Sequence, residues 1–413
     1  MMLCLAAVLC CACGAEAQYV GGDTQATDSA GAAAEADGAL EEEQGDAEPL
    51  TSLADSAPEE GEADATAQGP TADTPVGEDA VASGNDAAVE AGGDSGSTEP
   101  DGPGEVVPEP EPTSPSDPSE AGEFGVEVMT HTETLETAGG AEDVLMVIYM
   151  PEGDGPFPVV VFTHGFQLAP ADYASYGEHL ASWGYVAILP QFPGGLFGGP
   201  THVDLGNYLA ALLDWVEADT VVLSGKVDAT RIGLAGHSMG GKISLLLASE
   251  DDRPMAVFGV DPVDAAGGPI PMPEADYPSV TPERMDSITV PLGLLGETTN
   301  GASEGVFGQA CAPAEDNFQA YFDHAESPAI VIDVLGASHM SFLDNPECGL
   351  ACFACPSGTD DPATSRMLAQ RYMVAFFNVF VQGNTGYMDY LTGDAMASDV
   401  AAGLVSSETK NAF

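Results

Sequence analysis

Residues 236–240, Gly-His-Ser-Met-Gly, have the G-x-S-x-G spacing that presents a serine nucleophile on a sharp turn between a strand and a helix. Both glycines fit this role, because such a turn leaves no room for a Cβ atom beside the serine. The apolar run 232–235 precedes the motif, and the helix-forming run 242–248 follows it. Ser238 is therefore the predicted nucleophile. The backbone N–H of Met239, at the start of the helix, is a candidate donor to an oxyanion.

A serine hydroxyl needs a neighbouring imidazole to accept its proton, and with this motif the chain order is serine, acid, histidine. Two histidines follow a suitable acid. His324 lies within a predicted helix, where a place on the surface or in helix packing is expected. His339 lies in the loop 336–340, just after a predicted strand, and such a loop can bring the imidazole over Ser238. We therefore predict that His339 is the base.

Two carboxylates are candidates for the acid that orients this imidazole and stabilises its cation. Asp261 directly follows the apolar run 255–260, and Glu297 follows the run 290–295. The residues alone leave both open.

Two further histidines lie near these motifs. His164 follows the apolar run 159–163, and we expect it to hold the adjoining loop by hydrogen bonds rather than to react. His237, inside the serine motif, is expected to pack beside the nucleophile.

Apolar strand-like runs alternate with helix-like segments in the C-terminal part of the chain, which predicts an α/β fold with a mostly parallel, doubly wound sheet and helices on both faces. The predicted strands are 125–133, 143–149, 159–163, 185–189, 232–235, 255–260, 290–295 and 329–335, and the predicted helices are 171–183, 205–217, 242–248, 315–325 and 364–381. In such sheets the ligand site lies at the carboxyl ends of the strands. The candidate residues all follow strands: His164, Ser238, Asp261, Glu297 and His339.

Several motifs together resemble chlorophyllase and its bacterial esterase relatives, and the serine motif is also similar to that of secreted cutinases. They lie in the expected order within residues 124–381: Phe162–Phe166, Leu180–Tyr185, Leu234–Lys242, Gly259–Val263 and Gly336–Asp344. One departure is Met239, where plant members usually carry Arg.

The resemblance implies an α/β-hydrolase with Ser238 as nucleophile, Asp261 as acid and His339 as base. It also implies an oxyanion hole made by the backbone N–H groups of Phe166 and Met239, and no cofactor. The expected activity is that of an exported serine carboxylesterase on a hydrophobic ester, such as a phytyl ester, an acyl lipid or a polyester. An alternative is a surface-tethered binding or adhesion protein on a degenerate hydrolase scaffold, since fold alone does not guarantee activity. The retained serine, acid and histidine favour the enzyme.

Composition divides the chain into parts. Residues 14–123 consist almost entirely of Ala, Gly, Glu, Asp, Thr, Ser and Pro, without Lys or Arg. Such a segment cannot bury enough apolar surface to offset its ordering entropy, so we expect a disordered acidic linker. Residues 124–413 are richer in apolar and aromatic side chains, and their length suits one catalytic domain with a single core.

The formal net charge is −59, and 29 of the 67 carboxylates lie in residues 14–123. All eight Lys and Arg lie in the predicted domain, opposite the other 38 carboxylates. This excess of negative charge disfavours nucleic acid and anionic membranes as partners, and suits a saline setting that screens self-repulsion. The expected partner is a small or polymeric ester, and the expected state is a monomer.

Residues 1–13 are apolar and too short to span a bilayer, as in an export signal, although they contain no basic n-region. Cys13, between Ala12 and Gly14, is a candidate for lipidation as in bacterial lipoproteins. The protein is thus expected to be secreted or held at the cell surface of a bacterium, with the linker acting as a tether.

Four cysteines in the predicted domain are compatible with two disulfides in an oxidising compartment: Cys311, Cys348, Cys352 and Cys355. The spacing of the last three also suits a zinc site. The absence of His from the cluster and the expected export favour disulfides, so no metal is predicted. The sequence leaves the pairing open.

Overall fold

The computed structural model describes residues 116–413, except for 195–198, 219–220, 266–271, 303–309 and 348–354. The predicted export signal, Cys13 and most of the predicted linker lie outside these residues. So do Cys348 and Cys352.

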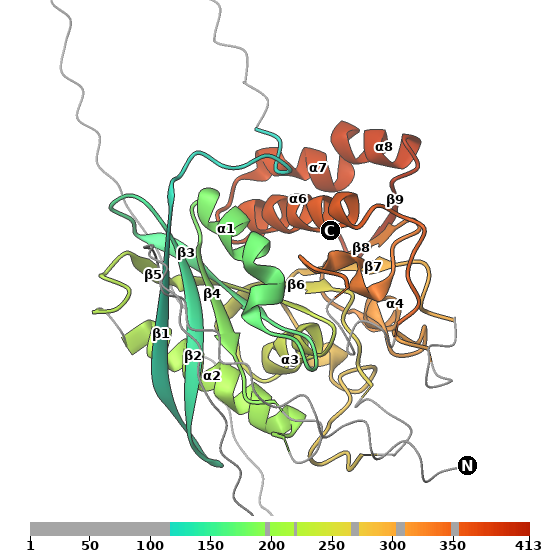
Figure 1. The fold of residues 1–413 in the computed structure, drawn as a ribbon. Coiled ribbons are helices and arrows are strands. Elements are labelled where there is room, and N and C mark those ends of the chain that lie inside the picture. The colour runs from blue at the N-terminus through green and yellow to red at the C-terminus, as the bar shows by residue number, and fades with distance from the viewer. Residues whose placement is uncertain (1–115, 195–198, 219–220, 266–271, 303–309, 348–354) are drawn as a thin grey trace, which may run out of the picture. The chain divides into compact units, whose positions relative to one another are not determined.

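The described chain forms one mostly parallel sheet (Figure 1). Its strands are β1 Val126–Thr137, β2 Gly140–Pro151, β3 Phe157–Thr163, β4 Val186–Gln191, β5 Val227–His237, β6 Pro254–Val260, β7 Leu292–Glu297, β8 Ala329–Val334 and β9 Val405–Lys410. Across the sheet their order is β1-β2-β4-β3-β5-β6-β7-β8-β9. Strands β3 to β8 run parallel, whereas β1, β2 and β9 pair antiparallel at the two edges.

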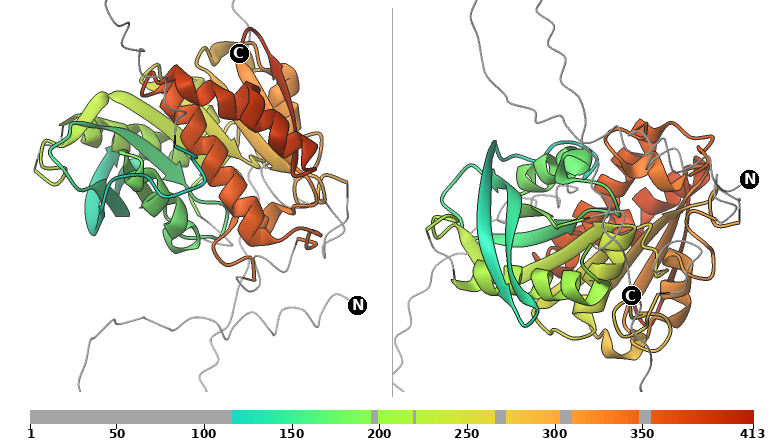
Figure 2. Two further views of the ribbon diagram at one scale, coloured as in Figure 1. Left: turned by 90° about the horizontal axis from the view of Figure 1, so that it is seen from above. Right: turned by 60° about the horizontal axis from the view of Figure 1, so that its bottom comes forward.

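Helices cover both faces of this sheet (Figure 2). They are α1 Ala174–Ser182, α2 His202–Ala218, α3 Met239–Ala248, α4 Phe318–His324, α6 Pro362–Phe380, α7 Met388–Thr392 and α8 Asp394–Ala401. Short 3₁₀ turns are η1 Pro170–Tyr173, η2 Met285–Ser287, η3 His339–Phe342 and η4 Thr385–Tyr387.

Two hydrophobic clusters fill the space between sheet and helices. Strand β3 is buried along its whole length, with Val159 and Val161 in the cluster of α2, α3 and α4, and Val160 and Phe162 in that of α1, α6 and α7. A strand buried on both faces has no polar alternation, which explains its continuous apolar sequence. The prediction of a mostly parallel α/β sheet with helices on both faces is confirmed.

The predicted elements differ from the structure mainly in their ends. Helix α4 begins at Phe318 rather than near 315, because the Asn317 side chain accepts a hydrogen bond from the Gln319 N–H and caps the helix there. Strand β9 and helices α7 and α8 were not predicted. Strand β9 is a polar edge strand, Val-Ser-Ser-Glu-Thr-Lys, buried only at its first residue, so it lacks the apolar run used to find the others.

Residues 116–123, on the linker side of the predicted boundary, pack against α1. The Gly122 N–H donates to Ser182 Oγ at 2.9 Å, and the Trp183 indole N–H donates to the Glu120 carbonyl at 3.0 Å. Within the described ranges, no helix combines the length and apolar character needed to cross a membrane.

Candidate active site

Ser238 lies on the turn between β5 and α3, with φ 56° and ψ −124°. This conformation is rare for a residue with a side chain and stores strain. A Cβ atom at Gly236 or Gly240 would collide with Thr163. The close approach of β3 to this turn therefore requires glycine on both sides of Ser238, as the sequence predicted.

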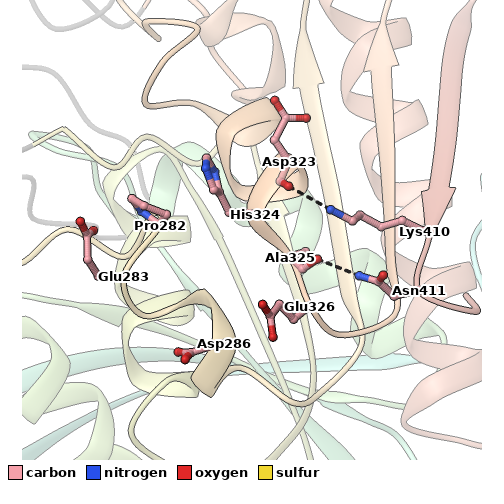
Figure 3. A pocket seen from close by; sticks show the side chains of 9 residues that line it. All are labelled: Pro282, Glu283, Asp286, Asp323, His324, Ala325, Glu326, Lys410 and Asn411. Carbon is pink, nitrogen blue, oxygen red and sulfur yellow. Dashed lines mark hydrogen bonds between the residues drawn. The ribbon is translucent and has the colours of Figure 1, made fainter.

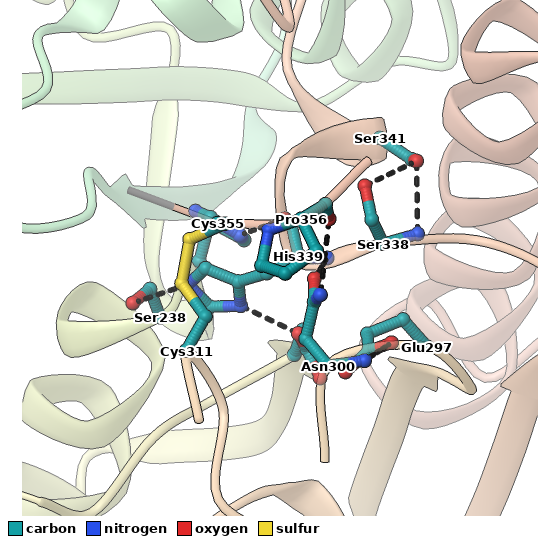
Figure 4. The surroundings of a disulfide bond; sticks show 11 residues. Ser238, Glu297, Asn300, Cys311, Ser338, His339, Ser341, Cys355 and Pro356 are labelled. Carbon is teal, nitrogen blue, oxygen red and sulfur yellow. Dashed lines mark hydrogen bonds and ion pairs between the residues drawn. A yellow bond between two sulfur atoms is a disulfide. The ribbon is translucent and has the colours of Figure 1, made fainter. Parts of the chain in front are cut away.

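The loop after β8 brings His339 next to Ser238. The His339 Nε2 atom is 2.9 Å from Ser238 Oγ (Figure 4). His339 Nδ1 is 2.5 Å from Asp261 Oδ2. Asp261 directly follows β6 and is fully buried, with φ 44°. The chain thus brings together three residues that lie on separate strand ends in the sequence.

Burial sets the protonation of this group. It lowers the pKa of His339 to about 4, so the imidazole is uncharged at neutral pH. Nδ1–H then donates to Asp261, and the Nε2 lone pair can accept the Ser238 hydroxyl proton. Burial also raises the pKa of the Asp261 carboxyl, an effect that the neighbouring Glu297 backbone N–H opposes.

Glu297, the other candidate acid, also lies at the carboxyl edge of the sheet but is directed elsewhere. Its Oε2 accepts hydrogen bonds from the backbone N–H groups of Thr299 and Asn300, the latter at 2.6 Å. Burial, and then the charge of Asp261, raise the pKa of Glu297 to about 8. The structure therefore places Asp261, and not Glu297, against the imidazole.

The candidate oxyanion donors lie on two segments beside Ser238. Met239 is the first residue of α3, where backbone N–H groups have no partner within the helix. Phe166 follows β3, and its side chain is 54% exposed. His164 braces this second segment: its Nδ1 donates to the Gly165 carbonyl at 2.9 Å, and its Nε2 accepts the Phe192 N–H at 3.1 Å. These contacts agree with the supporting role predicted for His164.

His324 lies in a helix, α4, as the sequence predicted. It occupies the end of α4, where its Nδ1 donates to the Ala320 carbonyl at 2.9 Å. It lines a pocket of about 830 Å³ (Figure 3). The lining residues 323–326 precede β8, so the pocket lies toward the amino end of that strand, whereas Ser238 follows the carboxyl end of β5. Ser238, Asp261 and His339 are not among the residues that line this pocket, which are Pro282, Glu283, Asp286, Asp323, His324, Ala325, Glu326, Lys410 and Asn411.

A disulfide joins Cys311 to Cys355 close to the His339 loop (Figure 4). The bond removes Cys355 from the thiolates that the alternative zinc site would need. Cys348 and Cys352 fall outside the part of the chain that the structure describes. The disulfide agrees with the expectation of oxidised cysteines and supplies one pairing that the sequence left open.

Asn300 was not predicted from the sequence. It is fully buried, its Oδ1 accepts the His339 backbone N–H at 2.8 Å, and its Nδ2 donates to the Pro356 carbonyl at 3.0 Å. It therefore links the base to the segment next to the Cys355 disulfide. Its only sequence signal is a position three residues after Glu297, which carries no chemical motif.

A mostly parallel sheet with helices on both faces, and with Ser238 on the sharp turn after β5, defines the protein as an α/β-hydrolase. A family model described as Chlorophyllase matches residues 119–407, and the chain belongs to the chlorophyllase family.

Individual relatives agree with this assignment. Chlorophyllase-2 of Arabidopsis thaliana is 24% identical over 254 residues, covering 58% of this chain and 78% of the relative. Cutinase 1 of Thermobifida cellulosilytica is 23% identical over 246 residues, covering 59% and 76%. Bis(hydroxyethyl) terephthalate hydrolase of Streptomyces coelicolor is 24% identical over 254 residues, covering 59% and 64%. The protein is a carboxylic-ester hydrolase.

Proposed function

We propose that this protein is an exported serine esterase that cleaves a hydrophobic carboxylic ester through an acyl-enzyme on Ser238. The observation that carries the proposal is one buried imidazole, His339, within hydrogen-bond distance of both Ser238 Oγ and Asp261 Oδ2. A nucleophile, a base and an orienting acid in this relation make up the catalytic machinery of serine hydrolases.

In this mechanism Ser238 Oγ attacks the ester carbonyl while His339 Nε2 takes the hydroxyl proton. Asp261 stabilises the imidazolium that forms. The backbone N–H groups of Phe166 and Met239 would donate to the developing oxyanion. In comparable sites, removing one side-chain donor to the oxyanion costs about 3–4 kcal/mol. His339 returns the proton to the leaving alcohol, and water, activated by the same imidazole, then releases the acid and restores Ser238.

The proposed substrate class is a hydrophobic ester. The exposed aromatic ring of Phe166 adjoins the proposed oxyanion hole, and Met239 and Met340, both partly exposed, adjoin Ser238 and His339 in the chain. Apolar groups in these positions would favour an apolar acyl or alcohol part over a charged one. The names of the relatives include chlorophyllase, cutinase and a terephthalate-ester hydrolase. A phytyl ester, an acyl lipid and a polyester all fall within the proposed class.

The test combines a fluorophosphonate probe, which reacts with activated serines, with p-nitrophenyl esters of increasing acyl length. The full chain is expected to be labelled at Ser238 alone and to hydrolyse the esters. Ser238→Ala should lose both properties. Ser249→Ala is a matched control that removes a hydroxyl donating to the Leu246 carbonyl at the end of α3, and it should keep both. A folded wild-type chain that is neither labelled nor active would contradict the proposal and favour the binding protein.

We also propose the domain arrangement and location predicted from the sequence: an export signal at residues 1–13, an acidic linker at 14–123 and the catalytic domain after it. The Cys311–Cys355 disulfide supports an oxidising compartment, because disulfides persist there. In a bacterial host given labelled palmitate, the full chain should incorporate label and Cys13→Ala should not. Equal labelling of both chains would contradict a lipid on Cys13, and retention of both in the cytoplasm would contradict export.

A further inference from the structure

His237 lies at the centre of a chain of buried hydrogen bonds beside the proposed catalytic residues. It is the last residue of β5 and is fully buried. Its Nε2 is 2.9 Å from the carbonyl oxygen of His339, and its Nδ1 is 2.8 Å from the hydroxyl of Tyr173. The Tyr173 hydroxyl in turn lies 3.2 Å from the backbone nitrogen of Gly165.

The chemistry of these groups fixes the direction of each hydrogen bond. A carbonyl oxygen only accepts, so His237 Nε2 must carry the proton that it donates to His339. Burial lowers the pKa of His237 well below its usual value, so the ring is neutral and Nδ1 can only accept. Tyr173 therefore donates its hydroxyl proton to Nδ1, and its oxygen accepts the Gly165 N–H.

The two ends of this chain belong to different parts of the proposed machinery. Gly165 precedes Phe166, whose N–H is a proposed oxyanion donor, and His339 is the proposed base. We propose that Tyr173 and His237 are positioning residues that hold the oxyanion segment and the base in fixed relation. This inference rests on the proposed function, because it assigns these hydrogen bonds an effect on the rate of ester hydrolysis.

The His339 peptide is held from both sides. Asn300 Oδ1 accepts its N–H at 2.8 Å, and His237 donates to its carbonyl. The imidazole rings of His237 and His339 also pack with their centres 4.6 Å apart. Hydrogen bonds shielded from water in this way are strong and directional, so the His339 backbone has little freedom to rotate its ring away from Ser238.

Neither Tyr173 nor His237 is proposed to touch substrate, which separates this role from simple binding. A small shift of the oxyanion donor relative to the base would weaken the transition state more than the bound substrate. Loss of these hydrogen bonds should therefore lower kcat while leaving KM nearly unchanged.

The decisive variant is Tyr173→Phe, which removes one oxygen and leaves the ring in place. We expect kcat for p-nitrophenyl esters to fall by about tenfold, with KM within about twofold of wild type. Tyr185→Phe is the matched control: Tyr185 is also fully buried, and its hydroxyl donates to Asn378 Oδ1 at 2.8 Å rather than to His237. Both variants should lose similar thermal stability, but only Tyr173→Phe should lose kcat.

Substitutions of His237 distinguish the contribution of its hydrogen bond to His339 from that of its hydrogen bond to Tyr173. A glutamine amide can place an N–H near the position of Nε2, so His237→Gln should keep the hydrogen bond to His339. His237→Phe keeps an aromatic ring but removes both hydrogen bonds. The expected order of kcat is wild type, then His237→Gln, then His237→Phe.

A measurement that does not need activity tests the hydrogen bonds of His237 independently. In the ¹⁵N spectrum of histidine-labelled protein, His237 should appear as a neutral imidazole with its proton on Nε2, and the Nδ1 resonance should shift in Tyr173→Phe. A proton on Nδ1, or a Tyr173→Phe enzyme with wild-type kcat, would overturn the inference. If the proposed function itself were wrong, the result would differ: the wild-type protein would lack Ser238-dependent hydrolysis, whatever the protonation of His237.

Discussion

Asp261→Asn is expected to lower kcat by about 10⁴-fold while the protein stays folded. The same change of the acid in other serine triads has an effect of this size. Asparagine has nearly the same shape as aspartate, but it carries no charge to stabilise the imidazolium of His339. Its amide also offers an N–H toward Nδ1, which favours the tautomer with the proton on Nε2. That proton would occupy the atom that must accept from Ser238. The measurement is kcat on a p-nitrophenyl ester, beside a thermal melt.

Glu297→Gln is the matched control, because it makes the same chemical change on the adjacent strand end. Glu297 Oε2 accepts two backbone N–H groups, and a glutamine carbonyl can do the same. Its raised pKa also means that the native carboxyl is already largely protonated at pH 7. We expect its kcat to remain within about tenfold of wild type, since it is not bonded to His339. The reverse pattern, a large loss of kcat in Glu297→Gln and a small one in Asp261→Asn, would identify Glu297 as the acid of the triad.

The sequence was sufficient to predict strands β3 to β8, because helices bury them on both faces and they therefore have distinctive apolar runs. The same property placed Ser238, Asp261 and His339 at strand ends, where a parallel sheet gathers them. These apolar runs did not predict which acid, Asp261 or Glu297, pairs with His339. Both acids end neighbouring strands, so the residues alone left the choice open, and the family resemblance was needed to favour Asp261.

The supporting residues around the site could not be predicted in this way. Tyr173, Asn300 and Cys311 come from three separate segments, and their partners lie 64, 39 and 44 residues away in the sequence. No local spacing marks such contacts, because they depend on how loops meet above the sheet. His237 was predicted to pack beside the nucleophile. Its hydrogen bonds became visible only when Tyr173 and the His339 carbonyl were placed around it.

Glu297 should make the folded protein less stable as the pH rises from about 4.5 to about 8. Burial and the neighbouring Asp261 raise its folded pKa from 4.5 to about 8. Below pH 4.5 the group is protonated in both folded and unfolded chains, so its contribution to stability is fully present. Between these values the unfolded chain loses the proton first, and stability falls by at most about 1.4 kcal/mol per pH unit. Above about pH 8 both states are ionised, and this contribution no longer changes.

The free energy of unfolding, measured by denaturant titration at pH 5 and pH 8.5, isolates this effect when wild type is compared with Glu297→Gln. Other ionisable groups titrate in both chains, so they cancel in the comparison. We expect wild type to lose about 2–4 kcal/mol more than Glu297→Gln over this range, an amount below the full shift because the unfolded group is already largely ionised at pH 5. Equal losses in the two chains would show that Glu297 is ionised in the folded protein at neutral pH. The carboxylates of Asp261 and Glu297 would then both be charged at neighbouring strand ends, and the neutral state invoked for the Glu297→Gln control would be wrong.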